Sequence, residues 1–243
     1  MSAVNMHAVA MQSALSQVTV VVPVGPGDTL TRELRAQLSL LPPAAQVCVV
    51  CSDEPSHELI GAGLRSTPGP QWQCLLSPRG RALQQNAGAL AASRSWLWFV
   101  HADSVLAPDT LPALARWIQR DIQALAYFDL RFLDDGPALM WLNTSGAWLR
   151  SRLLGLPFGD QGLVFPRALF EALGRFNTVL AGGEDHALVW RARRTGVPLR
   201  PLRAPIYTSA RKYAEHGWGA TTGTHLRETW KQARRFSRVE RSR

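Results

Sequence analysis

The sequence predicts an α/β protein whose mainly parallel central sheet is flanked by helices. Apolar strand-like runs alternate with amphipathic helical runs through the first half of the chain, the pattern of strands joined by covering helices. The run Trp96–Val100 then leads directly into His101-Ala-Asp103-Ser104. Open α/β sheets bind ligands at the carboxyl ends of their strands. These observations predict the fold and the edge of the sheet where a site lies.

Each element follows from its local pattern. Continuous or alternating apolar runs predict strands at Val18–Val24, Gln46–Cys51, Trp72–Leu76, Trp96–Val100, Tyr127–Phe132 and Gly162–Phe165. Apolar residues at helical spacing predict helices at Thr29–Leu41, Arg81–Ser93, Leu111–Ile118, Ala138–Leu154 and Ala187–Thr195. Pro42-Pro43 ends the first of these helices, and Gly196 ends the last.

The length of 243 residues, 46% of them hydrophobic, suits one large domain with a substantial core. We expect this domain at residues 17–225, after a disordered leader at 1–16 and before a basic tail at 226–243. No apolar run is long enough to span a bilayer, and the start of the chain lacks a basic segment and a long apolar block. A cytoplasmic location is therefore expected.

Arginine dominates the basic residues, which together with the acidic ones give a formal net charge of +9. Forked arginine donors suit phosphate, which leaves nucleic acid, anionic lipid and a phosphorylated small molecule as partners. The basic residues are dispersed, and no helix-turn-helix, zinc or RNA-binding signature is present, so no nucleic-acid partner is expected. Cys48 and Cys51 lie within a predicted strand, and with Cys74 they are expected to be reduced core thiols.

Asp103 is the first candidate site residue. A carboxylate at the end of a buried strand can hold Mg²⁺ or Mn²⁺ against phosphate oxygens. The alternative is that Asp103 caps a turn, which is the commoner role of a single aspartate after a strand.

The segment Ser77-Pro-Arg79-Gly-Arg81 opens a predicted helix and is a candidate diphosphate cradle. A helix start offers free N–H groups to an anion, and Arg79 and Arg81 add positive charge. Asn86 and Gly88 are poor helix formers inside this helix, so hydrogen bonding or close approach must offset their cost. The alternative is a pair of solvated arginines and a tolerated glycine.

Two glycine-flanked segments carry the remaining carboxylates. Gly159-Asp160-Gln161-Gly162 predicts a tight turn that either points into a cleft or closes a hairpin. Gly182-Gly183 precede Glu184 and Asp185 at a helix start. One of these two carboxylates is expected to interact with the helix dipole, and the other is a candidate general base.

Two late regions complete the candidates. Arg211 and His216 follow the last apolar run, and the histidine is a metal ligand, a phosphate contact or a surface residue. Trp and Leu side chains accompany Arg150 and Arg152 in Ala138–Leu156, the composition of a helix that lies on a membrane surface. The alternative is that these tryptophans pack on the sheet and line an acceptor cleft.

In this order, the segments resemble the inverting family 2 glycosyltransferases, which have the GT-A fold. More narrowly, they are similar to a bacterial subgroup with an Arg-Gly-Arg-Ala-Leu-Gln-x-Asn-Ala-Gly helix, a His-Ala-Asp-Ser/Thr metal motif, a Gly-Asp-Gln turn and a Glu-Asp helix start. Phe128-Asp-Leu-Arg-Phe132 is a further shared motif. The resemblance runs from about Val18 to His216.

The resemblance implies a Rossmann-like fold, a nucleotide-sugar donor and a role for each matched residue. Asp103 would bind Mg²⁺ or Mn²⁺, with His101 where many relatives have a first aspartate and His216 as a late ligand. The donor nucleotide would be held by Arg79, Arg81, Asn86, Asp53 and Arg211. Asp185 would be the catalytic base beside Glu184, and Asp160 and Gln161 would shape the acceptor side.

The resulting hypothesis is a metal-dependent inverting glycosyltransferase with an unknown hydroxyl acceptor and possible contact with a membrane surface. Relatives usually read Pro-x-x-Asn-Glu after the first strand, whereas Pro23 is followed here by Val24-Gly-Pro-Gly-Asp28. The alternative is a degenerate relative that binds nucleotide without turnover.

Overall fold

The computed structural model describes residues 3–180, 182–223, 227, 231 and 234. Its helices are α1 (Ala3–Leu15), α2 (Arg32–Leu38), α3 (Glu54–Leu64), α4 (Arg81–Leu90), α5 (Thr110–Gln119), α6 (Met140–Arg152), the 3-10 helix η1 (Gly159–Gln161), α7 (Arg167–Ala172), α8 (Glu184–Arg194) and α9 (Arg211–His216). Its strands are β1 (Val18–Val24), β2 (Gln46–Cys51), β3 (Gln71–Leu76), β4 (Trp96–Phe99), β5 (Val105–Leu106), β6 (Leu125–Phe132), β7 (Val164–Pro166) and β8 (Leu199–Thr208).

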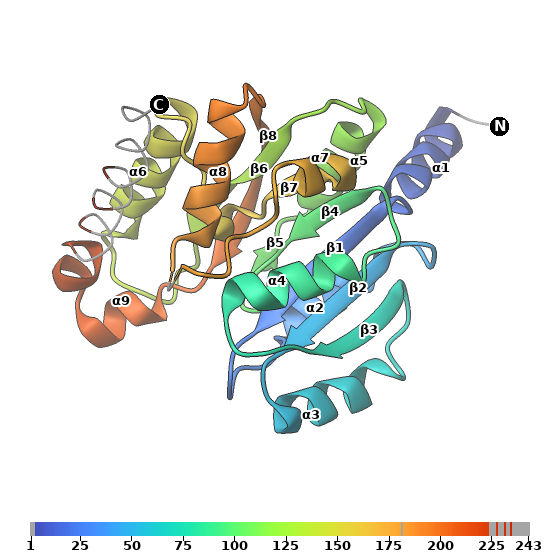
Figure 1. The fold of residues 1–243 in the computed structure, drawn as a ribbon, viewed down its shortest axis with the longest axis horizontal. Helices are drawn as coiled ribbons and strands as arrows, with labels where there is room; N and C mark the ends of the chain where they lie inside the picture. The colour runs from blue at the N-terminus through green and yellow to red at the C-terminus, as the bar shows by residue number, and fades with distance from the viewer. Residues whose placement is uncertain (1–2, 181, 224–226, 228–230, 232–233, 235–243) are drawn as a thin grey trace.

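These strands form one sheet in the order β3-β2-β1-β4-β7-β6-β8-β5 (Figure 1). Strands β1 to β4 are parallel, as predicted, because α2, α3 and α4 connect each of them to the next by crossing back over the sheet. β7 then runs antiparallel between β4 and β6, while β6 and β8 are parallel. The α/β class with a mainly parallel sheet is confirmed, and the antiparallel pairing of β7 is one feature that the sequence pattern did not predict.

Helices cover both faces of the sheet, so the core forms two layers. One layer packs α1, α2, α3 and α5 against the sheet, and Trp98 is fully buried within it. The other lies beneath α4, α7 and α8, where Phe99 contacts Phe165, Phe170 and Phe176. Neighbouring residues of β4 therefore enter opposite layers, as the alternation of a strand requires.

The expectation of a disordered leader is wrong. Ala3–Leu15 form helix α1, which packs on α5. Ala14 and Leu15 are buried in the core, and Met11 packs against it. Alanine, methionine and leucine favour helix, and burial of this end stabilises the segment. Most of the predicted basic tail lies outside the described residues, but Arg227, Lys231 and Arg234 are helical and exposed.

The three cysteines are free thiols, as predicted. Burial raises the pKa of Cys48 to about 12, so this thiol is protonated and unreactive. The Sγ atoms of Cys51 and Cys74 lie 3.9 Å apart across neighbouring strands.

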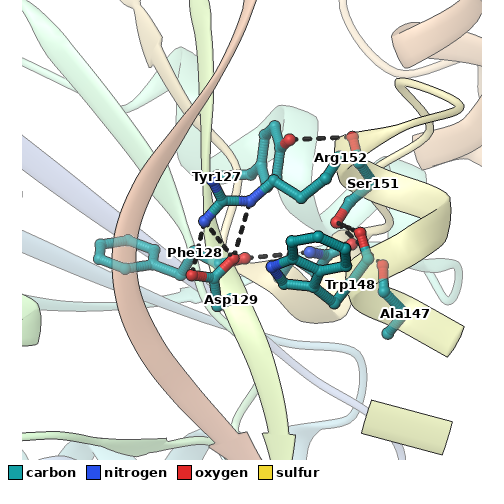
Figure 2. Close-up of polar contacts among 8 residues, drawn as sticks. Tyr127, Phe128, Asp129, Ala147, Trp148, Ser151 and Arg152 are labelled. Carbon is teal, nitrogen blue, oxygen red and sulfur yellow. Dashed lines mark hydrogen bonds and ion pairs between the residues drawn. The ribbon is translucent and has the colours of Figure 1, made fainter. Parts of the chain in front are cut away.

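Helix α6 is joined to β6 by polar contacts (Figure 2). Arg152 Nη2 lies 2.7 Å from Asp129 Oδ2, and the Tyr127 hydroxyl donates to the carbonyl of Ser151 at 2.9 Å. Only Met140, Ala147 and Ser151 of this helix are buried. Because so few apolar side chains of α6 reach the sheet, these polar contacts fix its position.

Candidate functional site

The candidate site lies along the carboxyl edge of the parallel strands. The loops after β1, β2, β3 and β4 leave the sheet at this edge because the four strands run in the same direction. Asp53, Arg79 and Asp103 lie in the last three of these loops, and Arg79 and Asp103 are exposed.

Helix α4 is held close to this edge by its own polar residues. Gln84 Nε2 donates to the carbonyls of Val24 and Val50 at 2.6 and 2.7 Å, which ties the helix to the ends of β1 and β2. A Cβ at Gly88 would lie 2.4 Å from Val21 Cγ1, so only glycine permits this approach. Close approach therefore accounts for Gly88, as one of the two predicted alternatives requires.

Asn86 uses both ends of its side-chain amide to hydrogen-bond the backbone of one residue, Phe176. Its Nδ2 donates to the carbonyl of Phe176 at 2.9 Å, and its Oδ1 accepts from the Phe176 N–H at 3.1 Å. These bonds join α4 to the loop after α7 and give Asn86 a structural role. Contact of Asn86 with a nucleotide remains a prediction.

The Gly159 turn brings two predicted site residues, His101 and Asp185, together. The Gly159 N–H donates to Asp185 Oδ2 at 2.6 Å. A Cβ at Gly159 would lie 3.1 Å from that oxygen and 3.5 Å from His101 Nε2. His101 therefore faces Asp185 across a position where a larger residue would crowd both. This juxtaposition joins the end of β4 to the start of α8.

Asp185 is held as a carboxylate. Its Oδ1 accepts from the His186 N–H at 2.8 Å, in addition to the Gly159 bond at Oδ2. Burial opposes ionisation, but the His186 imidazole and the two amides outweigh it, so the pKa of Asp185 lies below its usual range. Burial lowers the pKa of His186 itself to about 4.

The start of α8 depends on Gly182 and Gly183, whose φ angles are 147° and 74°. This backbone conformation favours glycine and turns the chain so that Glu184 and Asp185 both enter the site region. Glu184 is buried, and burial together with the Asp185 charge raises its pKa. Glu184 is thus the more readily protonated member of this pair.

Asp160 has the opposite character to Asp185. Burial raises its pKa to about 6, and the nearby Asp185 charge adds to this effect. The charges of Arg150 and Arg81 act against it. Asp160 Oδ1 is buried and has no hydrogen-bond partner among the described residues. A buried carboxylate oxygen without a partner suits a ligand hydroxyl.

Arg150 is the functional candidate that the sequence analysis missed, because it assigned this residue to a membrane-surface helix. Its guanidinium stacks over the Phe158 ring, and Nη2 donates to Gln161 Oε1 at 3.2 Å. Burial lowers the pKa of Arg150 to about 10, against the opposing charges of Asp160 and Asp185. The sequence signal that could have identified Arg150 is its position as a charged residue among the tryptophans and leucines of this helix.

Two further aromatic residues complete this side of the site. The rings of Phe158 and His186 lie 3.6 Å apart, centroid to centroid. Burial and then the Asp160 charge raise the pKa of Tyr213. No sequence pattern marked Phe158 or Tyr213 as functional.

Gln161 uses both ends of its side-chain amide on protein groups. Its Oε1 accepts from Arg150 and from the Phe158 N–H, while Nε2 donates to the Phe128 carbonyl at 3.0 Å. This arrangement fixes the turn that carries Gly159. Direct contact of Gln161 with an acceptor remains a prediction.

Asp53 and Arg211 make their contacts outside this cluster. Asp53 Oδ1 accepts from the Ser56 N–H at 2.9 Å and caps α3, and this bond is the main cause of its lowered pKa. Arg211 is exposed, and its Nε lies 3.5 Å from Asp135 Oδ2. His216 ends α9, but its side chain lies outside the described part of the structure.

Several solved structures resemble this chain in fold. Staphylococcus aureus TarS 1-349 in complex with UDP-GlcNAc has a TM-score of 0.60 and 18% identity, over 79% of this chain and 58% of that one. The mannosyltransferase PcManGT from Pyrobaculum calidifontis, in complex with GDP-Man and Mn²⁺, has a TM-score of 0.63 and 18% identity, over 96% of this chain and 74% of that one.

The chain spans 58% of that TarS fragment and 36% of a longer TarS structure. No protein-family model matches the sequence, and no curated protein matches it significantly. The sheet, its covering helices and the structural matches together show that the chain has the GT-A fold of glycosyltransferases.

Proposed function

We propose that the chain is an inverting glycosyltransferase that moves a sugar from a nucleotide-diphosphate donor to an acceptor hydroxyl. The observation that carries this proposal is the juxtaposition of His101, the Gly159 turn and Asp185 at the carboxyl edge of a GT-A sheet. Structures of similar fold were solved with UDP-GlcNAc, with UDP and with GDP-Man, which supports a nucleotide-sugar donor here.

Asp185 is the proposed base. The acceptor hydroxyl gives its proton to the Asp185 carboxylate while the acceptor oxygen bonds to the anomeric carbon of the donor sugar. The bond from that carbon to the diphosphate breaks, and the nucleoside diphosphate leaves with both bonding electrons. A single displacement inverts the anomeric configuration. The two amide donors hold Asp185 ionised and fix its orientation before the acceptor arrives.

Arg81, Asp160 and Arg150 would supply the surrounding charge. Arg81 is close enough to lower the pKa of Asp185 and to oppose the rise at Asp160. It begins α4, so positive charge and free N–H groups meet at one point, which suits the negative charge that develops on the leaving diphosphate. Asp160, with its unpartnered oxygen, would accept a hydrogen bond from an acceptor hydroxyl.

A divalent cation fits one part of this arrangement. Among the described residues, no three His, Cys, Asp or Glu side chains gather as a metal site. Asp103 is a single exposed carboxylate after β4. Mg²⁺ is commonly held by one or two carboxylates together with substrate phosphates, so Asp103 suits an ion that binds along with the donor. Asp103, with His216 as a second predicted ligand, would hold the ion, which would neutralise charge on the leaving diphosphate.

The donor base would be read at the ends of β1 and β2. Asp53 lies in the loop after β2, and the Gly27 backbone contributes to lowering its pKa. Asp53 therefore lies against the loop after β1, where Gly25-Pro26-Gly27 is part of the segment that departs from the usual pattern of relatives. Base specificity is left to experiment.

A donor-hydrolysis and transfer assay tests the proposed function. The chain would be incubated with a panel of UDP- and GDP-sugars, in Mn²⁺ or in EDTA, and release of UDP or GDP would be measured. Release from a subset of donors, with an inverted anomeric product by NMR, is the expected result. Thermal stabilisation by nucleotide without any release would instead support the degenerate, nucleotide-binding alternative. A panel that neither stabilises the protein nor is hydrolysed would contradict both.

A further inference from the structure

Helix α6 turns most of its large apolar side chains to solvent, although Met140 and Ala147 are buried, and several of its polar side chains face the protein. Asn143 Oδ1 accepts from Trp218 Nε1 at 2.7 Å, Arg150 donates to Gln161, and Ser151 is buried. A surface helix of a globular domain normally has the reverse arrangement, with its apolar stripe turned toward the core. Most of the large apolar side chains of α6 therefore lack a core to pack against, and its outward side is suited to an apolar neighbour.

The outward side forms a continuous patch, which we call the α6 apolar face. Its members are large, exposed hydrophobic residues of α6 and its ends: Leu139, Trp141, Leu142, Trp148, Leu149, Leu153 and Leu154. Trp141 and Trp148 lie two helical turns apart, and the side chains of Trp141 and Leu153 are 60% and 68% exposed. Exposed apolar patches of this kind mark interaction sites rather than ordinary surface.

Basic residues adjoin this face. Arg193 is exposed at the end of α8, and its Nη1 donates to the carbonyl of Leu154 at 2.9 Å. The segment after α9 is tied to α6 because Asn143 Nδ2 donates to Thr222 Oγ1 at 3.2 Å. Further along, Arg227, Lys231 and Arg234 are exposed, and their spacing places them on one helix face. Tryptophan, leucine and arginine together suit the boundary between lipid headgroups and acyl chains.

We propose that the α6 apolar face docks on the surface of an anionic lipid bilayer. Trp and Leu would enter the headgroup boundary, and the adjoining Arg and Lys would meet lipid phosphates. Among the described residues, no helix has the length and apolar character needed to cross a membrane. The contact is therefore a peripheral one.

The same helix connects this face to the candidate site. Arg150 lies on α6 and interacts with Asp160 of the Gly159 turn. Docking would therefore hold the acceptor side of the site next to the bilayer. If the proposed function holds, this arrangement suits an acceptor that is carried on a lipid. That corollary rests on the proposed function, whereas the docking itself does not.

Vesicle co-sedimentation tests the docking. The full chain would be mixed with vesicles of phosphatidylcholine plus phosphatidylglycerol, or of phosphatidylcholine alone, at low and high salt. We expect partitioning into the anionic vesicles that weakens as salt rises. Leu153→Ser combined with Leu154→Ser should weaken it about ten-fold, because two apolar side chains leave the lipid boundary.

A matched control is available on the other helices. Leu59 and Leu90 lie on α3 and α4 and are 69% and 70% exposed, so Leu59→Ser with Leu90→Ser removes the same groups elsewhere. This control should partition as wild type does, and both double variants should melt at the wild-type temperature. Equal binding to neutral and anionic vesicles, or an equal loss in the control, would overturn the proposal. The proposal would also be overturned if the wild-type chain does not bind vesicles but self-associates with rising concentration in ultracentrifugation, and if the Leu153 and Leu154 changes abolish that self-association.

Discussion

The two halves of the sheet contribute to the candidate site in opposite ways. The parallel half, β3 to β4, ends in loops whose charged residues, such as Arg79 and Asp103, are exposed to solvent. The half that begins at β7 gathers charged groups away from solvent, where Arg150 and Asp160 carry displaced pKa values. One half thus presents solvated residues to a ligand, and the other holds its charges before any ligand binds.

This difference bears on where catalysis would come from. Buried charges are costly to arrange, but once fixed they need no reorganisation at the moment of reaction. Asp185 and Asp160 are neighbours whose pKa values are moved in opposite directions, so the two carboxylates are set up for different roles. The parallel half is then expected to govern donor affinity, and the other half turnover.

The largest expected effect is on turnover in a variant of Asp185, which separates turnover from donor affinity. Asp185→Asn keeps the shape of the side chain but cannot take a proton, so turnover should fall about 10²–10⁴-fold. Donor affinity, measured by calorimetry, should stay close to wild type. Glu184→Gln is the neighbouring control, and a variant of Asp185 with full activity would move the base role to Glu184 or away from both.

Asp103 tests the parallel half. UDP and GDP should bind more tightly in Mn²⁺ than in EDTA, and Asp103→Ala should weaken binding in Mn²⁺ at least about ten-fold. Asp109 is an exposed aspartate of the same connection and makes no side-chain cap bond, so Asp109→Ala is the matched control. Equal affinities in both buffers would remove the metal role from Asp103.

A variant of Asp160 tests whether a buried charge in the second half lowers the stability of the folded chain. The pKa of Asp160 is raised from 3.8 to about 6 in the folded chain, so stability falls as pH rises through this range. Asp160→Asn removes that loss and should be more stable than wild type at neutral pH by about 1–2 kcal/mol. The difference in free energy of unfolding, from urea titrations, should shrink toward the lower end of this range. A less stable variant at neutral pH would mean that the attraction to Arg150 outweighs burial.

The smallest effects compare how helices approach the sheet in the two halves. Gly88→Ala in α4 forces a Cβ to within 2.4 Å of Val21 Cγ1 and should destabilise by about 1–2 kcal/mol. Gly146→Ala in α6 meets no atom within 4 Å and should stabilise by about 0.5–1 kcal/mol through helix propensity. Thermal unfolding measures both, and a Gly88→Ala variant as stable as wild type would show that α4 does not pack as closely as described.

Local pattern was sufficient for the strands of the parallel half, but it did not predict helix α3 between β2 and β3. Val18–Val24 and Gln46–Cys51 are strands with the predicted bounds, because buried parallel strands are continuous apolar runs. The predicted Gly162–Phe165 strand starts two residues later, at Val164. Strand β8 was not predicted, since Pro201 and Pro205 interrupt its apolar pattern.

Parts of the candidate site had a local sequence signal: His101 directly follows a buried strand, and Asp185 follows a glycine pair at a helix start. Arg150 and Tyr213 were not, because their roles depend on which side of a helix faces the turn. Helix α6 carries apolar residues around most of its circumference, so its spacing alone does not reveal the inward side. Only the tertiary arrangement supplies that information.

The join between the halves is short. β4 and β7 pair through Trp96↔Pro166, Leu97↔Phe165 and Trp98↔Val164, and β7 meets β6 at the single pair Ala126↔Val164. His101 follows β4, whereas the Gly159 turn precedes β7, so the site spans this join. Hydrogen exchange at the Phe99 amide, which donates to the Leu163 carbonyl at 2.9 Å, would report its opening. A nucleotide-sugar that bridges His101 and the Gly159 turn would then act as a clamp. It would slow hydrogen exchange at the Phe99 amide without touching that position.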